Sequence, residues 1–300
     1  MKKVGYFFAS FLPLLITYGM QFLAIFFMLG VAVLFLFPVF PGAQADPGGF
    51  SEIYSMMTNT DFNGAIMIIY SILCIAIFGM WYYRSCGGDY LPEARTTFSA
   101  MQLCGIIVLI PGSQFLCSYL ISFLSVLFPN WLEQYERLME SAGMSGSVTF
   151  IIFCYSVILG PINEELIFRG VTMRLARQSL PFWGANILQA ILFGILHGNW
   201  LQGCYAAALG LLLGFICEKG GSIYYSILMH ILFNFWGVVI AELFSDIENT
   251  AAAAVLMLVI TAVSMAVGLL LFLFGMKRRR AKVYAVKHPQ PPQESFPEEQ

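Results

Sequence analysis

The sequence predicts an all-α fold: a polytopic membrane helix bundle of about eight transmembrane helices with a polar cavity at mid-membrane depth. The 300 residues are 59% hydrophobic and only 11% charged, and long apolar runs recur along the chain. A soluble globular protein carries about 25% charged residues, so this chain lacks the polar groups to cover a water-facing surface. The net charge of −2 indicates no nucleic-acid partner. We therefore expect a lipid bilayer around the chain, as a multi-pass protein of the cell membrane.

Eight apolar runs are candidate membrane spans. A helix needs about 20 apolar residues to cross the hydrocarbon core, and most of the runs reach that length. The first apolar stretch far exceeds the ~7–15-residue core of a signal peptide, so we expect a retained helix there. The expected spans are 8–37, 63–83, 98–127, 148–173, 184–200, 203–217, 222–243 and 252–276.

Positive charges predict the orientation of these spans. If Lys2 and Lys3 place the N-terminus in the cytoplasm, eight spans leave nearly all of the 15 Lys and Arg residues on the cytoplasmic side. Only Arg137 falls on the opposite side, and Arg169 falls inside a span. The positive-inside rule thus predicts that both termini are cytoplasmic. The residues on the cytoplasmic side are Lys2, Lys3, Arg84, Arg95, Arg174, Arg177, Lys219, Lys277, Arg278, Arg279, Arg280, Lys282 and Lys287.

Four segments are expected along the chain. Three spans occupy residues 1–147, and a core that contains the polar motifs occupies 148–245. The last span and its basic flank occupy 246–282. Residues 283–300 are rich in Pro, Gln and Glu, which is typical of a disordered tail, here cytoplasmic.

Charged residues within the core segment mark the first candidate site, because a charge at the centre of a membrane helix costs at least ~2.5–3.5 kcal/mol. Glu164, Glu165 and Arg169 follow Pro161, which frees a backbone carbonyl. Glu165 and Arg169 are four residues apart and can neutralise each other on one helix face, which leaves Glu164 without a local partner. The alternative is an interfacial helix end with an ordinary ion pair.

Two further motifs place imidazoles in apolar spans. Phe193 precedes His197 by four residues, and His230 precedes Asn234 by four, so each pair shares a helix face. At ~1.5 Å rise per residue, the polar members of these motifs and Glu164 all reach mid-membrane depth. We therefore expect one shared polar chamber. The alternative for His197 is a hydrogen bond between packed helices, and the alternative for His230 and Asn234 is a role in packing alone.

The chemistry of such a chamber is that of hydrolysis. A carboxylate and an imidazole shielded from bulk water can together deprotonate one water molecule. A second imidazole and a carboxamide can donate hydrogen bonds to the oxyanion of an attacked carbonyl, each worth ~2.7–4 kcal/mol. A divalent ion at Glu164, His197 and His230 is the alternative, although the HExxH zinc signature is absent.

In order and spacing, these motifs resemble those of the CAAX prenyl protease type II / Abi (CPBP) family of intramembrane proteases. The likeness covers about residues 148–236, and the combination is specific although each motif is short. The matching residues are Glu164, Glu165 and Arg169 for EExxxR, Phe193 and His197 for FxxxH, and His230 and Asn234 for HxxxN.

The resemblance implies a membrane endopeptidase that hydrolyses membrane-associated peptide or protein substrates, prenylated or not, in a cavity open to the cytosol or inner leaflet. By position, Glu164 would be the general base on water, assisted by His197. His230 and Asn234 would form the oxyanion hole. The supporting residues would be Glu165, Arg169 and Phe193. A glutamate mechanism without metal is the favoured account of the prenyl-protease members, so we expect no cofactor.

Two functions from other classes remain as alternatives. One is an inactive CPBP-like membrane scaffold or immunity protein, and the other is a proton-coupled transporter whose intramembrane Glu and His relay protons. Alanine at Glu164, His197 and His230 together distinguishes them. A protease loses its cleavage activity, a transporter is recognised by proton-coupled flux in proteoliposomes, and a scaffold still functions in cells.

Overall fold

The computed structural model describes residues 2–36, 59–86, 98–144, 148–240 and 250–287. Every regular element within these ranges is a helix, which confirms the expected all-α, polytopic membrane bundle. Three segments are π-helical and carry the label η. The helices are α1 (Lys2–Ala9), α2 (Leu12–Leu36), α4 (Thr60–Cys86), α6 (Ala100–Leu127), α7 (Pro129–Ser141), α8 (Phe150–Phe153), η3 (Cys154–Leu159), α9 (Gly160–Glu165), η4 (Leu166–Thr172), α10 (Met173–Arg177), α11 (Phe182–Leu196), α12 (Trp200–Gly220), α13 (Ile223–Phe235), η5 (Trp236–Ile240) and α14 (Ala251–Lys287).

Seven helices in the described part of the chain are long and apolar enough to cross a membrane. The eighth expected span corresponds to α11, which has 15 residues. Its length of about 22 Å, at ~1.5 Å per residue, falls short of the ~30 Å hydrocarbon core. The count of eight spans is therefore not confirmed.

The position of His197 differs from the expectation of a residue within a helix running to 200. His197 is the C-cap of α11, and Gly198 beyond it has a φ of 64°. A glycine in this left-handed conformation is a common way for a helix to end. The helix therefore stops at Leu196, and α12 begins only four residues later.

α11 and α12 form an antiparallel hairpin held by small residues. A Cβ on Gly194 of α11 would lie 2.5 Å from the carbonyl oxygen of Gly203, so the two backbones touch there. Further along, a Cβ on Gly210 would lie 3.2 Å from Ala190. Such close contacts are typical of helix packing in membranes, where dispersion forces and interhelical hydrogen bonds replace the hydrophobic effect.

The span Phe150–Arg177 enters a π-helical register twice, in η3 and in η4. In η3 the N–H of Gly160 bonds the carbonyl of Tyr155, five residues back. The next bond in this register would join residue 161 to Ser156, but Pro161 has no N–H. The carbonyl of Ser156 is therefore left without a donor in this register. It is the carbonyl that Pro161 was expected to free.

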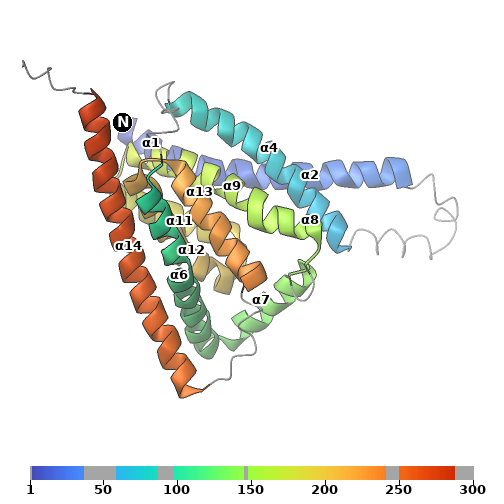
Figure 1. Ribbon diagram of the computed structural model, residues 1–300. Coiled ribbons are helices and arrows are strands. Elements are labelled where there is room, and N and C mark those ends of the chain that lie inside the picture. Colours follow the sequence, from blue (N-terminus) through green and yellow to red (C-terminus); the bar gives the residue numbers. More distant parts are fainter. Residues whose placement is uncertain (1, 37–58, 87–97, 145–147, 241–249, 288–300) are drawn as a thin grey trace, which may run out of the picture.

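The bundle has a central group of helices between two flanks (Figure 1). α9, α11, α12 and α13 lie in the middle, α14 packs along α6 on one side, and α2 and α4 lie on the other. α14 approaches α6 through glycines, and a Cβ on Gly268 would lie 2.9 Å from the backbone nitrogen of Leu109.

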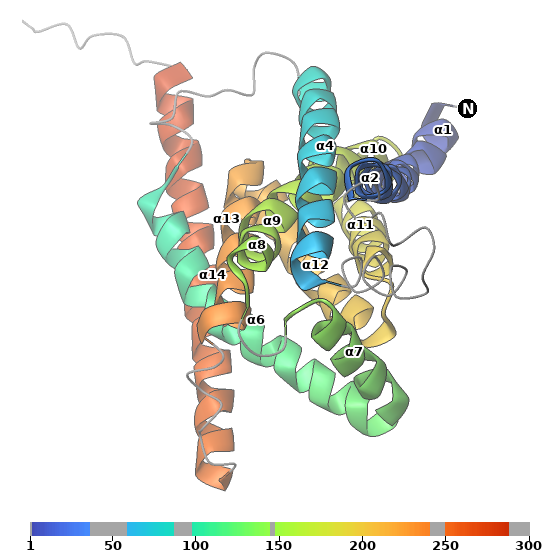
Figure 2. The same cartoon turned by 90° about the vertical axis from the view of Figure 1, so that its right-hand side faces the viewer.

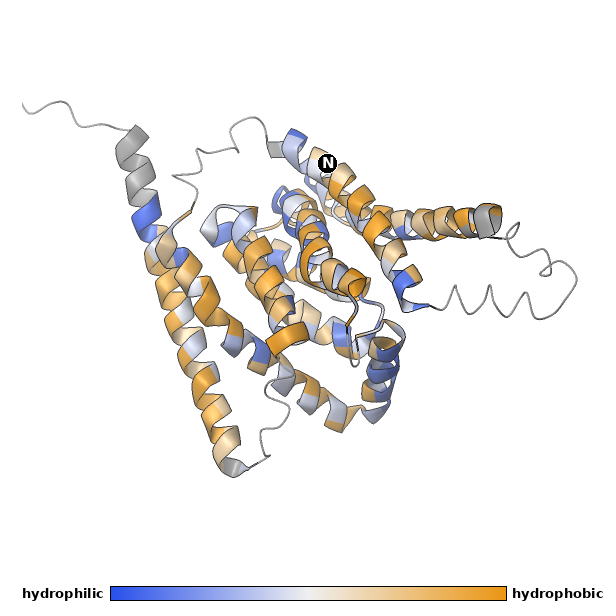
Figure 3. Cartoon of the chain, turned by 45° about the vertical axis from the view of Figure 1, so that its right-hand side comes forward, coloured by the Kyte–Doolittle hydropathy of each residue, from blue (hydrophilic) through white to orange (hydrophobic). Residues whose placement is uncertain are grey.

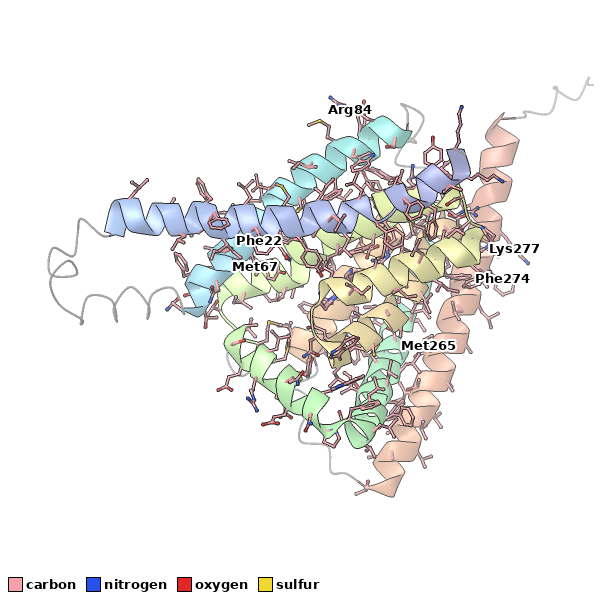
Figure 4. All side chains as sticks on the ribbon, turned by 180° about the vertical axis from the view of Figure 1, so that it is seen from behind. Phe22, Met67, Arg84, Met265, Phe274 and Lys277 are labelled. Carbon is pink, nitrogen blue, oxygen red and sulfur yellow. The ribbon has the colours of Figure 1, made fainter. Side chains whose placement is uncertain are left out.

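The outer surfaces of the flanking helices are apolar. Phe22 of α2 is 62% exposed and Phe274 of α14 is 54% exposed (Figure 4). Colouring by hydropathy shows mostly apolar helices, whereas α7 is the most polar (Figure 3). These exposed apolar surfaces fit lipid contact.

One end of the bundle collects positive residues. Figure 2 shows the N-terminal end of α1 and the C-terminal ends of α4 and α14 on the same side, with α7 at the opposite end. The start of α11 and the end of α12 lie together, because Arg177 is 3.4 Å from Glu218 and Lys219 lies over the ring of Phe182. They lie at the positive end as well, because Arg279 of α14 donates to the carbonyl of Gly220 and α1 contacts α10. The side of the membrane that this end faces remains a prediction.

The C-terminal helix extends beyond its expected span. α14 continues to Lys287, so residues 283–287 of the expected tail are helical, and residues 288–300 lie outside the described part. The expected division of the chain into four segments remains a prediction.

Candidate active site

A buried ion cluster forms where the span Phe150–Arg177 packs against α13. Arg169 Nη1 lies 2.9 Å from Glu165 Oε1, and both side chains are fully buried. His230 Nδ1 lies 2.9 Å from the same carboxylate oxygen. A carboxylate ionised by its pairing with Arg169 only accepts hydrogen bonds, so the Nδ1 of His230 carries the hydrogen. This fixes the orientation of the imidazole.

Glu164 occupies the open side of this cluster. Its Oε2 lies 3.6 Å from His230 Nε2, and its side chain is 16% exposed. With Glu165 and Arg169 neutralising each other, Glu164 and His230 form an electrically neutral pair when they hold one proton between them. Uncompensated charge is costly at membrane depth, and Glu164 is the carboxylate of this cluster that has no guanidinium partner.

Phe193 of α11 contacts the Arg169 guanidinium and both imidazoles. The guanidinium carbon of Arg169 lies 4.6 Å from the centroid of its ring. The rings of His197 and His230 meet it edge-on at 4.9 and 5.7 Å between centroids. Phe193 is thus the residue of the FxxxH motif that contacts the other two motifs, through Arg169 and His230.

His197 is held by the backbone of its own helix. Its Nδ1 lies 2.9 Å from the carbonyl oxygen of Phe193. A carbonyl only accepts, so Nδ1 carries the hydrogen and the Nε2 of the neutral ring is an available base. Among the described residues, no hydrogen bond or ion pair joins His197 to Glu164. The structure instead pairs Glu164 with His230.

Asn234 satisfies the carbonyl that Pro161 leaves free. Its Nδ2 donates to the oxygen of Ser156 at 2.8 Å, from α13 to η3. One amide hydrogen is therefore used for helix packing and the other remains. π-Helical turns occur frequently at functional sites, and here the register of η3 and the position of Asn234 depend on each other.

Sequence reasoning missed two buried amides, Asn186 and Gln189 of α11, whose side chains are fully buried. Gln189 donates to the carbonyl of Gly210 at 2.9 Å, and Arg169 donates to the same oxygen at 3.2 Å. A signal for Gln189 was present, because Gln189, Phe193 and His197 recur every four residues and share one helix face.

Within the described residues, no group of three or more His, Cys, Asp or Glu side chains is arranged to hold a metal ion. The alternative ligand set of Glu164, His197 and His230 is thus not assembled as such. The expected absence of a cofactor remains a prediction.

The comparisons with known proteins fall on this region. Residues 146–236 match the family model described as "Type II CAAX prenyl endopeptidase Rce1-like", and this segment contains all of the motif residues. The resemblance inferred from the three motifs is therefore confirmed.

A curated relative also matches. The chain is 27% identical over 89 residues to the "Putative membrane peptidase YdiL" of Bacillus subtilis (strain 168). The match covers 30% of this chain and 36% of the relative, so it spans about a third of the relative's length. No solved structure matches the chain significantly.

Proposed function

We propose that the protein is a membrane-embedded endopeptidase in which Glu164 activates a water molecule for hydrolysis of a peptide bond. The observation that carries this proposal is the contact of Glu164 with His230 in a buried, charge-compensated cluster. The cluster lies within the segment that matches a CAAX endopeptidase family, and the match to a relative named as a membrane peptidase points to the same activity.

The two adjacent glutamates have different roles in this proposal. Glu165 already accepts from Arg169 and His230 and is fully buried, so it serves to orient those two residues. Glu164 is partly exposed, and His230 is its one ion-pair partner in the described part of the chain, so its carboxylate can take a proton from water. General bases of this kind contribute about 10²–10⁴-fold to a rate.

The proton balance of the reaction follows from this arrangement. Water gives a proton to Glu164 as its oxygen attacks the carbonyl carbon, and the tetrahedral intermediate carries the negative charge. Glu164 then returns the proton to the leaving amine as the C–N bond breaks. His197, with a basic Nε2, assists in orienting the water.

Stabilisation of the oxyanion is assigned to His230 and Asn234. Since Glu165 holds the Nδ1–H of His230, the Nε2–H of its charged form is directed away from Glu165, to the side of Glu164, where it can donate to the oxyanion. Asn234 retains one amide hydrogen beyond its bond to Ser156. Each donor of this type is worth ~2.7–4 kcal/mol in a site that excludes water.

The proposed substrates are peptide or protein segments that reach the membrane. Prenylated C-termini are included because the matched family model is that of a CAAX prenyl endopeptidase. We propose that no metal takes part, because the chemistry assigned above needs only a general base on water and hydrogen-bond donors to the oxyanion.

Replacement of the proposed base is the direct test. Glu164→Gln keeps the shape of the side chain and removes its basicity, so cleavage should fall by about 10²–10⁴-fold. The measurement compares membrane proteomes from cells that express wild type or Glu164→Gln and seeks a peptide terminus that only wild type generates. The purified protein is then assayed on that sequence, with and without its prenyl group.

Glu136→Gln, on the exposed face of α7, is the matched control and should cleave like wild type. Abundance and thermal unfolding of both variants show that the fold is retained, and a chelator should leave the wild-type rate unchanged. Wild-type cleavage by Glu164→Gln would exclude Glu164 as the base.

A further inference from the structure

Two buried amides connect α11 to the backbone of α12. The Nε2 of Gln189 lies 2.9 Å from the carbonyl oxygen of Gly210, and Asn186 Nδ2 donates to the carbonyl of Leu211 at 3.0 Å. Gln189 also donates to Asn186 Oδ1 at 2.8 Å. A buried amide is costly unless it is hydrogen-bonded, and these bonds satisfy the amide nitrogens of Gln189 and Asn186, whereas Gln189 Oε1 has no partner among the described residues.

The orientation of the Gln189 amide is determined by its surroundings. Its Nε2 faces three oxygen acceptors: the carbonyl of Gly210, and the carbonyl and side-chain oxygens of Asn186. A flipped amide would place an oxygen against all three and would be repelled. The nitrogen therefore faces α12, and the side chain is locked.

The sequence of α12 leaves room for this arrangement. A Cβ on Gly214 would lie 1.9 Å from Asn186 Oδ1 and 2.7 Å from Gln189 Nε2. Any residue other than glycine at 214 would displace the amide pair. The close approach of the two amides to α12 thus depends on this glycine.

A continuous path leads from Gln189 to the proposed base. The carbonyl oxygen of Gly210 accepts from both Gln189 and Arg169. The other arm of the Arg169 guanidinium bonds Glu165. Glu165 in turn holds His230, whose opposite nitrogen faces Glu164.

We propose that Gln189 is a positioning residue of the site, which fixes the Gly210 carbonyl and the Arg169 guanidinium and, through Glu165, sets the orientation and tautomer of His230. The effect on cleavage rests on the proposed endopeptidase function, whereas the effect on His230 does not. A residue that merely joined α11 to α12 would alter stability without altering the imidazole.

The test replaces Gln189 by methionine, which has a similar length and no hydrogen-bond donor. The matched control is Gln102→Met on α6, which is also fully buried and whose Oε1 accepts from the hydroxyl of Tyr225. Both variants lose a buried membrane glutamine, but only Gln189 is connected to Arg169. Full-length protein is labelled with ¹⁵N-histidine, and its ring resonances are recorded in detergent micelles. The chain has only 3 histidines, and variants of the other two assign His230.

Gln189→Met should shift the ring nitrogen resonances of His230, whereas Gln102→Met should leave them in place. With the peptide substrate, Gln189→Met should lower kcat by on the order of ten- to a hundredfold while KM stays within about twofold. Unchanged His230 resonances, an equal shift in Gln102→Met, or an unchanged kcat in a folded Gln189→Met protein would each overturn the proposal.

If Gln189→Met does not accumulate, Asn186→Ala replaces it, because it removes the side-chain acceptor of Gln189 and keeps Gln189 itself. The same shift of His230 is expected, with a smaller amplitude, and its absence overturns the proposal. A wild-type protein that cleaves no substrate would contradict the proposed function, while the resonances of His230 would still decide the role of Gln189.

Discussion

At the scale of single residues, the contact of Asn234 with Ser156 ties the third motif to a backbone irregularity next to the first. Pro161 removes the donor that the π-helical register would supply to the Ser156 carbonyl, and Asn234 supplies another from α13. A buried carbonyl without a partner costs about 1–3 kcal/mol. Asn234 therefore has a structural role besides the oxyanion role that we propose.

This pairing predicts a coupling between two residues on different helices. Asn234→Ala should lower the free energy of unfolding by about 1–3 kcal/mol, because the Ser156 carbonyl loses its donor. In a Pro161→Ala background, the backbone N–H restored at residue 161 can donate to the Ser156 carbonyl. Asn234→Ala should then lower the free energy of unfolding by less than it does in the wild type. A double-mutant cycle by denaturant unfolding in micelles measures the difference, and strictly additive effects would contradict the pairing.

At the scale of elements, the α11–α12 hairpin positions Phe193 and His197. α11 is too short to cross the hydrocarbon core alone, and its packing depends on glycines that let the two backbones touch. Because the end of α11 carries His197, the separation of these helices sets where that imidazole lies. The hairpin thus contributes both a motif and the amides behind Arg169.

Close packing at Gly194 predicts opposite effects of one substitution at two places. Gly194→Ala should destabilise the protein by about 1–3 kcal/mol, because its Cβ would lie 2.5 Å from the Gly203 oxygen. Gly19→Ala on α2 has nothing within 4 Å and should be neutral or stabilise by up to ~1 kcal/mol through helix propensity. Thermal unfolding of both variants in detergent tests this, and equal midpoints would refute the packing argument.

At the scale of the whole molecule, the hairpin preserves the expected sidedness even though α11 is short. The start of α11 and the end of α12 lie together at the positive end of the bundle, where Arg279 of α14 donates to the carbonyl of Gly220 and α1 contacts α10 (Figure 2). At the other end, Trp131 of α7 stacks on Trp200 at 5.9 Å between ring centroids. Tryptophans of this kind are enriched at membrane interfaces.

This arrangement predicts that the two termini face the cytoplasm and that α7 faces the opposite side. Epitopes placed at each terminus should bind an antibody added to cells only after the membrane is permeabilised. Glu136→Cys on α7 should react with a membrane-impermeant maleimide added to intact cells, and the parent protein supplies the background from its native cysteines. If Glu136→Cys is labelled only in inverted vesicles, the protein has the opposite orientation and the prediction is wrong.

The sequence determined the features that depend on one helix at a time. Composition identified a membrane protein, apolar runs located most spans, and four-residue spacing predicted that Glu165 and Arg169 could pair, as they do at 2.9 Å. The same spacing placed His230 and Asn234 on one face. Periodicity fixes depth and direction along a single axis, so these features needed no knowledge of neighbours.

Only the tertiary structure decided which helices lie side by side and how they are joined. That His230 meets both glutamates, that Asn234 meets Ser156, and that Gln189 is linked to Arg169 through Gly210 are contacts between segments far apart in the chain. They depend on lateral packing, which is set by small residues and interhelical hydrogen bonds rather than by hydropathy. The pattern of apolar residues likewise did not predict that α11 ends before His197. The helix is terminated by Gly198 in the left-handed conformation and not by a change in hydropathy.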